Sequence, residues 1–166
     1  MSWLSNIWKR FKAWCYADNR VQTQIHALSR YAVIEKYKGW AGDGNVRVAD
    51  KDYSVLSKFW LMRGYYNYYI KVLNGLKISG WEEKFDCDNF AGLYKEVLSA
   101  CHRVSTMSKS EGVAIGVVWY KTDSGGGHAI NTAIVDDDRV IFIEPQTGLE
   151  KTLSDTELNN IFFVLF

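Results

Sequence analysis

Three side chains that lie far apart in the sequence have types that could act together as a thiol site. Cys87 is predicted to begin a helix, and the free N–H groups and positive dipole end of a helix N-terminus favour the nucleophilic thiolate. His128 follows a run of glycines and opens a predicted strand. Glu144 ends the next apolar strand, from which its carboxylate could hydrogen-bond the imidazole. The pattern therefore predicts a thiol, an imidazole and a carboxylate in one site.

Cys87 also has a plainer interpretation, as a small buried apolar residue. Asp86 and Asp88 flank it, and their negative charges disfavour a thiolate. Cys101, at the far end of the same helix, and Cys15, in an aromatic stripe, are not favoured as anions. Three cysteines without CxxC spacing argue against a disulfide scaffold and against structural zinc.

The order of a cysteine on a helix, a histidine on the next central strand and an acid on the strand after it resembles that of papain-like cysteine enzymes. The run 86–91 resembles the nucleophile segment of bacterial transglutaminase-like cysteine peptidases. The runs 127–129 and 144–148 resemble papain-fold toxin and deamidase domains. The resemblance covers residues 81–150.

This resemblance implies a role for each matching residue. Cys87 would be the nucleophile, His128 the base and Glu144 the acid that orients the imidazole. The substrate would be bound by Trp81, Gly127 and Gln146. The family acid is usually Asp or Asn, so the run 136–138 supplies fallback acids, and the family's side-chain oxyanion donor has no clear counterpart before Cys87.

The resemblance implies a hydrolase or acyltransferase that acts through a thioester on an amide bond of a protein or peptide, without a cofactor. A peptidase, a glutamine deamidase and a transglutaminase-like enzyme would share these residues. The alternative is a catalytically inactive papain-fold module that binds or attaches. A metal site is not expected, because carboxylates at adjacent positions around Cys87 point in different directions around the helix end.

The elements that must position these residues follow from hydrophobic periodicity. Helices are predicted at 3–17, 20–37, 52–73 and 87–101, and strands at 113–120, 128–135, 140–144 and 161–166. This order predicts an α+β, papain-like fold in which N-terminal helices pack on a C-terminal antiparallel β-sheet. We expect a single domain over 1–166, with a helical part at 1–80 and the catalytic helix plus sheet at 81–166.

Composition and charge restrict the partners. A formal net charge of +1 gives no basic patch, so no nucleic-acid partner is expected. The start of the chain lacks the pattern of a secretory signal, and no apolar stretch is long enough to span a bilayer, so a cytoplasmic location is expected. The segment 3–17 is amphipathic, and docking on the protein's own core is favoured over a membrane interface. The oligomeric state stays open.

Overall fold

The computed structural model of the chain describes residues 21–105 and 110–166. Its strands are β1 (Thr23–Ser29), β2 (Val46–Arg47), β3 (Asp52–Leu56), β4 (Gly112–Val113), β5 (Ile115–Lys121), β6 (Gly127–Val135), β7 (Arg139–Glu144), β8 (Leu149–Lys151) and β9 (Ile161–Leu165). Its helices are α2 (Arg30–Ala41), α3 (Tyr66–Gly75), α4 (Cys87–Ser105) and α5 (Asp155–Asn159), with a 3₁₀ turn at Asp43–Asn45 and a π-helical segment at Trp60–Tyr65.

The described strands form one nine-stranded sheet with the order β1-β3-β6-β5-β9-β2. In addition, β4 pairs with β3, and β7 and β8 continue the sheet from β6. Strands β5, β6 and β7 pair antiparallel, whereas β3 pairs in parallel with β4 and β6, and β2 with β9. The sheet is therefore mixed.

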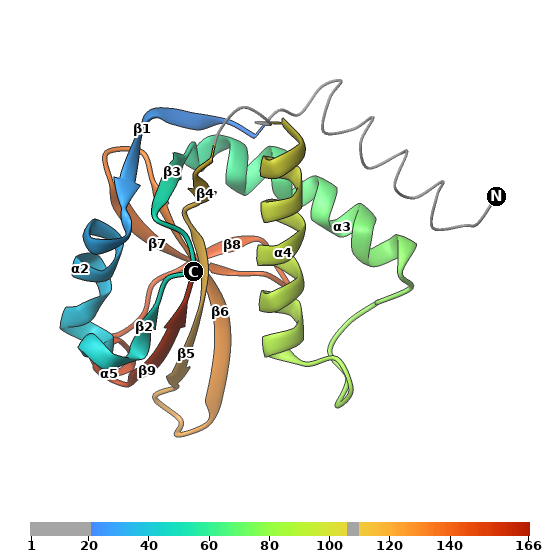
Figure 1. Cartoon of the computed structure of the whole chain (residues 1–166). Coiled ribbons are helices and arrows are strands. Elements are labelled where there is room, and N and C mark those ends of the chain that lie inside the picture. The colour runs from blue at the N-terminus through green and yellow to red at the C-terminus, as the bar shows by residue number, and fades with distance from the viewer. Residues whose placement is uncertain (1–20, 106–109) are drawn as a thin grey trace.

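Helices cover both faces of this sheet. Figure 1 shows α3 and α4 on one side of the central strands and α2 and α5 on the other. Side chains of β6 alternate accordingly: Ala133 and Val135 join the cluster beneath α3 and α4, and Ile130 and Ile134 join the cluster beneath α2. Because both faces are covered, β6 is buried continuously from Ala129 to Val135.

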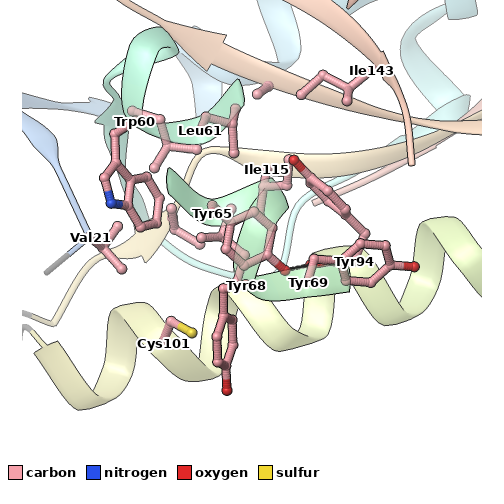
Figure 2. Packing of buried hydrophobic residues seen from close by; sticks show 14 of the residues in the cluster. Val21, Trp60, Leu61, Tyr65, Tyr68, Tyr69, Tyr94, Cys101, Ile115 and Ile143 are labelled. Carbon is pink, nitrogen blue, oxygen red and sulfur yellow. Dashed lines mark hydrogen bonds between the residues drawn. The ribbon is translucent and has the colours of Figure 1, made fainter. Parts of the chain in front are cut away.

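Tyrosine side chains pack α4 against the π-helical segment and α3 (Figure 2). Tyr94 lies in the middle of α4, with its ring centroid 4.8 Å from that of Tyr65 and 4.9 Å from that of Tyr69. The hydroxyl of Tyr65 donates to the carbonyl of Tyr94, and the hydroxyl of Tyr69 donates to the carbonyl of Phe90 at 3.0 Å. All three tyrosines are fully buried. The N-terminal end of α4 is thus held in a fixed position over the sheet.

The predicted fold class is wrong. The segment expected to be purely helical contributes β1, β2 and β3, and the sheet is an open mixed sheet rather than an antiparallel sheet that follows a helical half. The expected helix 20–37 begins only at Arg30, because residues 23–29 pair with β3. Ser29 then caps α2, accepting from the N–H of Ala32 at 3.3 Å.

The expected helix 52–73 begins with a strand for a related reason. Tyr53 to Leu56 are buried in succession, and a short continuous apolar run does not distinguish a central strand from a buried helix. The predicted helix at 87–101 and the strands at 113–120, 128–135, 140–144 and 161–166 are confirmed as α4, β5, β6, β7 and β9. The predicted amphipathic helix 3–17 lies outside the described residues. Within the described part of the chain, no helix is long and apolar enough to cross a membrane.

Candidate functional site

His128 and Glu144 meet across neighbouring strands. His128 lies near the start of β6 and Glu144 ends β7, and the two strands pair antiparallel. The Nε2 atom of His128 lies 2.9 Å from the Oε2 atom of Glu144, with side chains 21% and 18% exposed. The longer glutamate side chain therefore does reach the imidazole.

The environment of Glu144 keeps it ionised. Burial raises the pKa of this carboxyl, but the hydrogen bond from His128, the Gln146 N–H and the charge of Lys151 lower it by more. The Gln146 N–H donates to Glu144 Oε1 at 3.3 Å. The net pKa of Glu144 is lower than usual, so the carboxylate stays charged through the neutral range.

The turn that carries Glu144 and Gln146 is clamped by Tyr66. The Tyr66 hydroxyl donates to the Gln146 carbonyl at 3.0 Å. Gly148 in the same turn has φ +68°, and a Cβ atom there would lie 2.4 Å from the Tyr66 ring. Only glycine fits this backbone conformation and this close approach. Tyr66, whose closeness to this turn arises only in the folded chain, was not found from the sequence.

Two further residues that sequence reasoning missed support the imidazole. The ring of Tyr120 meets the ring of His128 edge to face, with centroids 5.8 Å apart. The Nζ atom of Lys151 lies over Tyr120, 5.4 Å from the ring centroid. Burial lowers the pKa of Lys151, but its contact with the Tyr120 hydroxyl and the charge of Glu144 raise it by more. The side chains at this end of the sheet therefore form a row in the order Lys151, Tyr120, His128 and Glu144.

Cys87 lies at the same end of β6 as His128. It is the first residue of α4, is half-buried, and packs with Trp119 against Ala91, Val117 and Ala129. Because Ala129 follows His128 in β6, Cys87 lies at the corner of the fold where β6 begins, whereas successive side chains of that strand point to opposite faces of the sheet. Cys101, by contrast, is fully buried on the inner face of α4.

The fallback acids do not lie at this corner. The run 136–138 follows the opposite end of β6, where Asp138 Oδ1 lies 2.8 Å from His26 Nε2. Asp136 accepts from the Gln24 amide at 2.7 Å and from the Lys58 N–H at 3.1 Å. These acids make their contacts elsewhere in the fold, and Glu144 is the carboxylate that is hydrogen-bonded to His128.

The predicted substrate-binding residues lie on three separate segments of the chain. Trp81 lies in the loop before α4 and is 58% exposed. Gly127 begins β6 and is exposed, with open space where a side chain would project. Gln146 is half-buried beside Glu144. The functional roles of these three residues, and of Cys87, His128 and Glu144, stay predictions.

The two acids that flank the thiol interact with each other. The Asp86 and Asp88 carboxyls share a hydrogen bond, which lowers the pKa of Asp86 and raises that of Asp88. The Asp86 N–H also donates to Asn89 Oδ1 at 3.2 Å. Among the described residues, no group of three or more histidine, cysteine or acidic side chains is arranged to hold a metal ion.

Comparisons with known proteins find one family model and two similar solved structures. The family model described as Agglutinin C-terminal matches residues 70–150. A structure of Polyporus squamosus lectin, bound to the human-type influenza-binding epitope Neu5Acα2-6Galβ1-4GlcNAc, is 21% identical with a TM-score of 0.66 and covers 84% of this chain and 49% of the lectin chain. A structure described as a PSL1a-E64 complex is 22% identical with a TM-score of 0.66, covering 84% and 51%. No curated protein matches the chain in sequence.

At this identity the two structures show a shared fold, and the chain spans about half the length of each. The comparisons correct several predictions, because the matches are to an agglutinin family and a lectin structure. The resemblance to papain-like cysteine enzymes rested on three short runs and their order. The prediction of a cysteine hydrolase or acyltransferase, with a protein or peptide amide as its substrate, is therefore wrong.

Proposed function

We propose that this chain is a carbohydrate-binding module of an agglutinin-like protein. The observation that carries the proposal is the fold that the chain shares with half of a lectin chain, together with the match of residues 70–150 to the agglutinin family model. The partner is then a glycan, and the lectin with the same fold suggests a sialylated one.

The chemistry of the corner at the start of α4 suits such a ligand. Sugar rings present an apolar C–H face and a set of hydroxyl groups, so their sites combine an aromatic surface with a few placed polar groups. Exposed Trp81 offers the aromatic surface. The carboxylate of Glu144, fixed by His128 and the Gln146 N–H, offers a charged acceptor whose hydrogen bonds are stronger than those of a neutral group.

The geometry also makes this corner rigid before any ligand arrives. Tyr66 clamps the turn that carries Gln146, and Tyr120 packs against the edge of the His128 ring. A preformed site loses less conformational entropy on binding than a flexible one. We therefore propose that the glycan binds near the hydrogen-bonded group of His128, Glu144 and Gln146, with Cys87 and Trp81 as further contacts.

The test is isothermal titration calorimetry of the chain alone with Neu5Acα2-6Galβ1-4GlcNAc and with the same glycan lacking sialic acid. We expect saturable binding that is lost in Trp81→Ala. Phe162→Ala is the matched control, because Phe162 is an exposed aromatic residue on β9. Absence of saturable heat for either glycan, or equal binding by Trp81→Ala and the unmodified chain, would refute the proposal.

A further inference from the structure

A cavity lies toward the other end of α4 from Cys87. Its volume is about 410 Å³, and it opens between the second half of α4 and the strands β3 and β4. This volume falls within the range of about 300 to 1,000 Å³ that is usual for small-molecule sites. None of the glycan-site residues lines this cavity.

One wall of the cavity is cationic. Lys95, Ser99, His102 and Arg103 line it from α4. Their spacing places them on one face of the helix, since residues three and four positions apart are neighbours there. The Lys95 side chain is only 15% exposed and its Nζ lies 2.9 Å from the exposed Glu96, whereas His102 is 4% exposed. The cations of this wall are Lys95, which is mostly buried, and Arg103, which is exposed.

The facing wall is acidic. Asp50 and Glu111 line it, and Glu111 Oε2 accepts a hydrogen bond of 2.9 Å from the Ser54 hydroxyl. The Asp50 N–H donates to the Tyr53 hydroxyl at 2.8 Å. A Cβ atom at Gly112 would lie 2.2 Å from Asp50 Oδ2, so glycine at this position leaves room for that carboxylate. Two carboxylates thus line the cavity from the segments that lead into β3 and β4, whereas the cations line it from α4.

Most of the remaining lining is apolar. Val113, Ile115 and Phe166 contribute to it, and each is at least nine-tenths buried. A ligand that matches all three parts carries one negative group, one positive group and an apolar portion. Charged groups removed from water require partners of opposite charge, which a cavity with two oppositely charged walls can supply.

We propose that this cavity binds the zwitterion of a free α-amino acid with an apolar side chain. The ligand's carboxylate faces Lys95 and Arg103, its ammonium faces Asp50 and Glu111, and its side chain lies against Phe166. This site is separate from the glycan site and goes beyond the proposed function.

The experiment titrates the ¹⁵N-labelled chain with L-phenylalanine and follows backbone amide shifts by NMR. Two derivatives each remove one charge: L-phenylalaninamide lacks the carboxylate, and N-acetyl-L-phenylalanine lacks the ammonium. We expect saturable shifts at Ser99 and Gly112 with phenylalanine, and binding at least about tenfold weaker for each derivative, the loss expected for one charge-assisted contact.

Variants test the walls separately. Arg103→Met and Glu111→Gln should each weaken phenylalanine binding by about tenfold. Lys71→Met is the control, because Lys71 is an exposed cation on α3 that does not line the cavity. Ser99→Trp should fill the cavity and abolish binding, with thermal unfolding recorded for every variant to show that it folds.

Shifts that are absent, that gather at Trp81 and His128 instead, or that are equal for phenylalanine and both derivatives would overturn the inference. Saturable binding of glucuronate without binding of phenylalanine would also overturn it, in favour of an acidic sugar. Glycan binding measured on the same variants is expected to be unchanged. A failure here is therefore distinguishable from a failure of the proposed function.

Discussion

The carboxylate of Glu144 and the imidazole of His128 are joined by a hydrogen bond of 2.9 Å between Oε2 and Nε2. The two residues are brought together by antiparallel pairing of β6 with β7, and both side chains are largely buried. A largely buried carboxylate that accepts such a hydrogen bond couples the stability of the corner to pH.

The pH dependence follows from the lowered pKa of Glu144. Because the folded pKa lies below the unfolded value of about 4.3, this carboxylate adds stability that is fully present above that pH. The contribution is lost as the pH falls through the folded pKa. We expect the free energy of unfolding of the unmodified protein to fall more steeply below about pH 4.3 than that of Glu144→Gln.

Denaturant unfolding at several pH values measures this slope. Glu150→Gln is the control, because Glu150 pairs with Lys58 in a more exposed setting, where an ion pair contributes about 0 to 1 kcal/mol. Acid slopes that are the same for Glu144→Gln and the unmodified protein would show that Glu144 is not stabilised as its contacts imply.

Gly148→Ala should lower the free energy of unfolding by more than the cost of the positive φ alone. The positive φ costs about 1 to 3 kcal/mol for a residue with a Cβ atom, and the Tyr66 ring occupies the space that the Cβ atom needs. Gly125→Ala separates these effects, since Gly125 has φ +88° with open space around it. Urea unfolding should show the larger loss for Gly148→Ala, and equal losses would contradict the proposed clamp.

Tyr65→Phe should cost about 1 to 3 kcal/mol of unfolding free energy. It removes the hydroxyl that donates to the buried carbonyl of Tyr94 while leaving the aromatic packing in place. Tyr31→Phe, at an exposed position, should change little. If both variants unfold at the same denaturant concentration as the unmodified protein, the hydrogen bond does not anchor α4.

Cys87 should react with iodoacetamide faster than Cys101. The Cys87 thiol is half-buried at the start of α4, whereas Cys101 is enclosed on the inner face of the same helix. Peptide mapping by mass spectrometry reports each cysteine separately. Faster modification of Cys101 than of Cys87 would contradict the burial of these two thiols in the described fold.

The elements around the site could be predicted because their signals are local. The apolar face of α4 recurs at helical spacing through Phe90, Tyr94 and Leu98, and β5 to β7 are apolar runs separated by turn residues. The meeting of His128 and Glu144 follows once their strands are neighbours. In contrast, β1 and β3 depend on pairing with each other and with β6, which no local pattern reports.

The supporting residues of the site could not be predicted for a similar reason. Tyr66 approaches Gly148, and Lys151 approaches Tyr120, only after distant segments have folded together. Many tyrosines of this chain lie on helical patterns. Their residue type alone does not distinguish a tyrosine that supports the site from one that packs in the core. The three runs that resemble papain-like enzymes were short, so they could not distinguish that family from the agglutinin family whose model matches residues 70–150.

The central claim is that this chain binds a glycan at the corner beside the start of α4. The most direct measurement is NMR mapping of backbone amide and tryptophan indole N–H shifts on the chain alone during titration with Neu5Acα2-6Galβ1-4GlcNAc. The account predicts saturable shifts concentrated at Trp81, His128 and Gln146. Shifts that do not saturate, or that concentrate on another surface of the described fold, would contradict it.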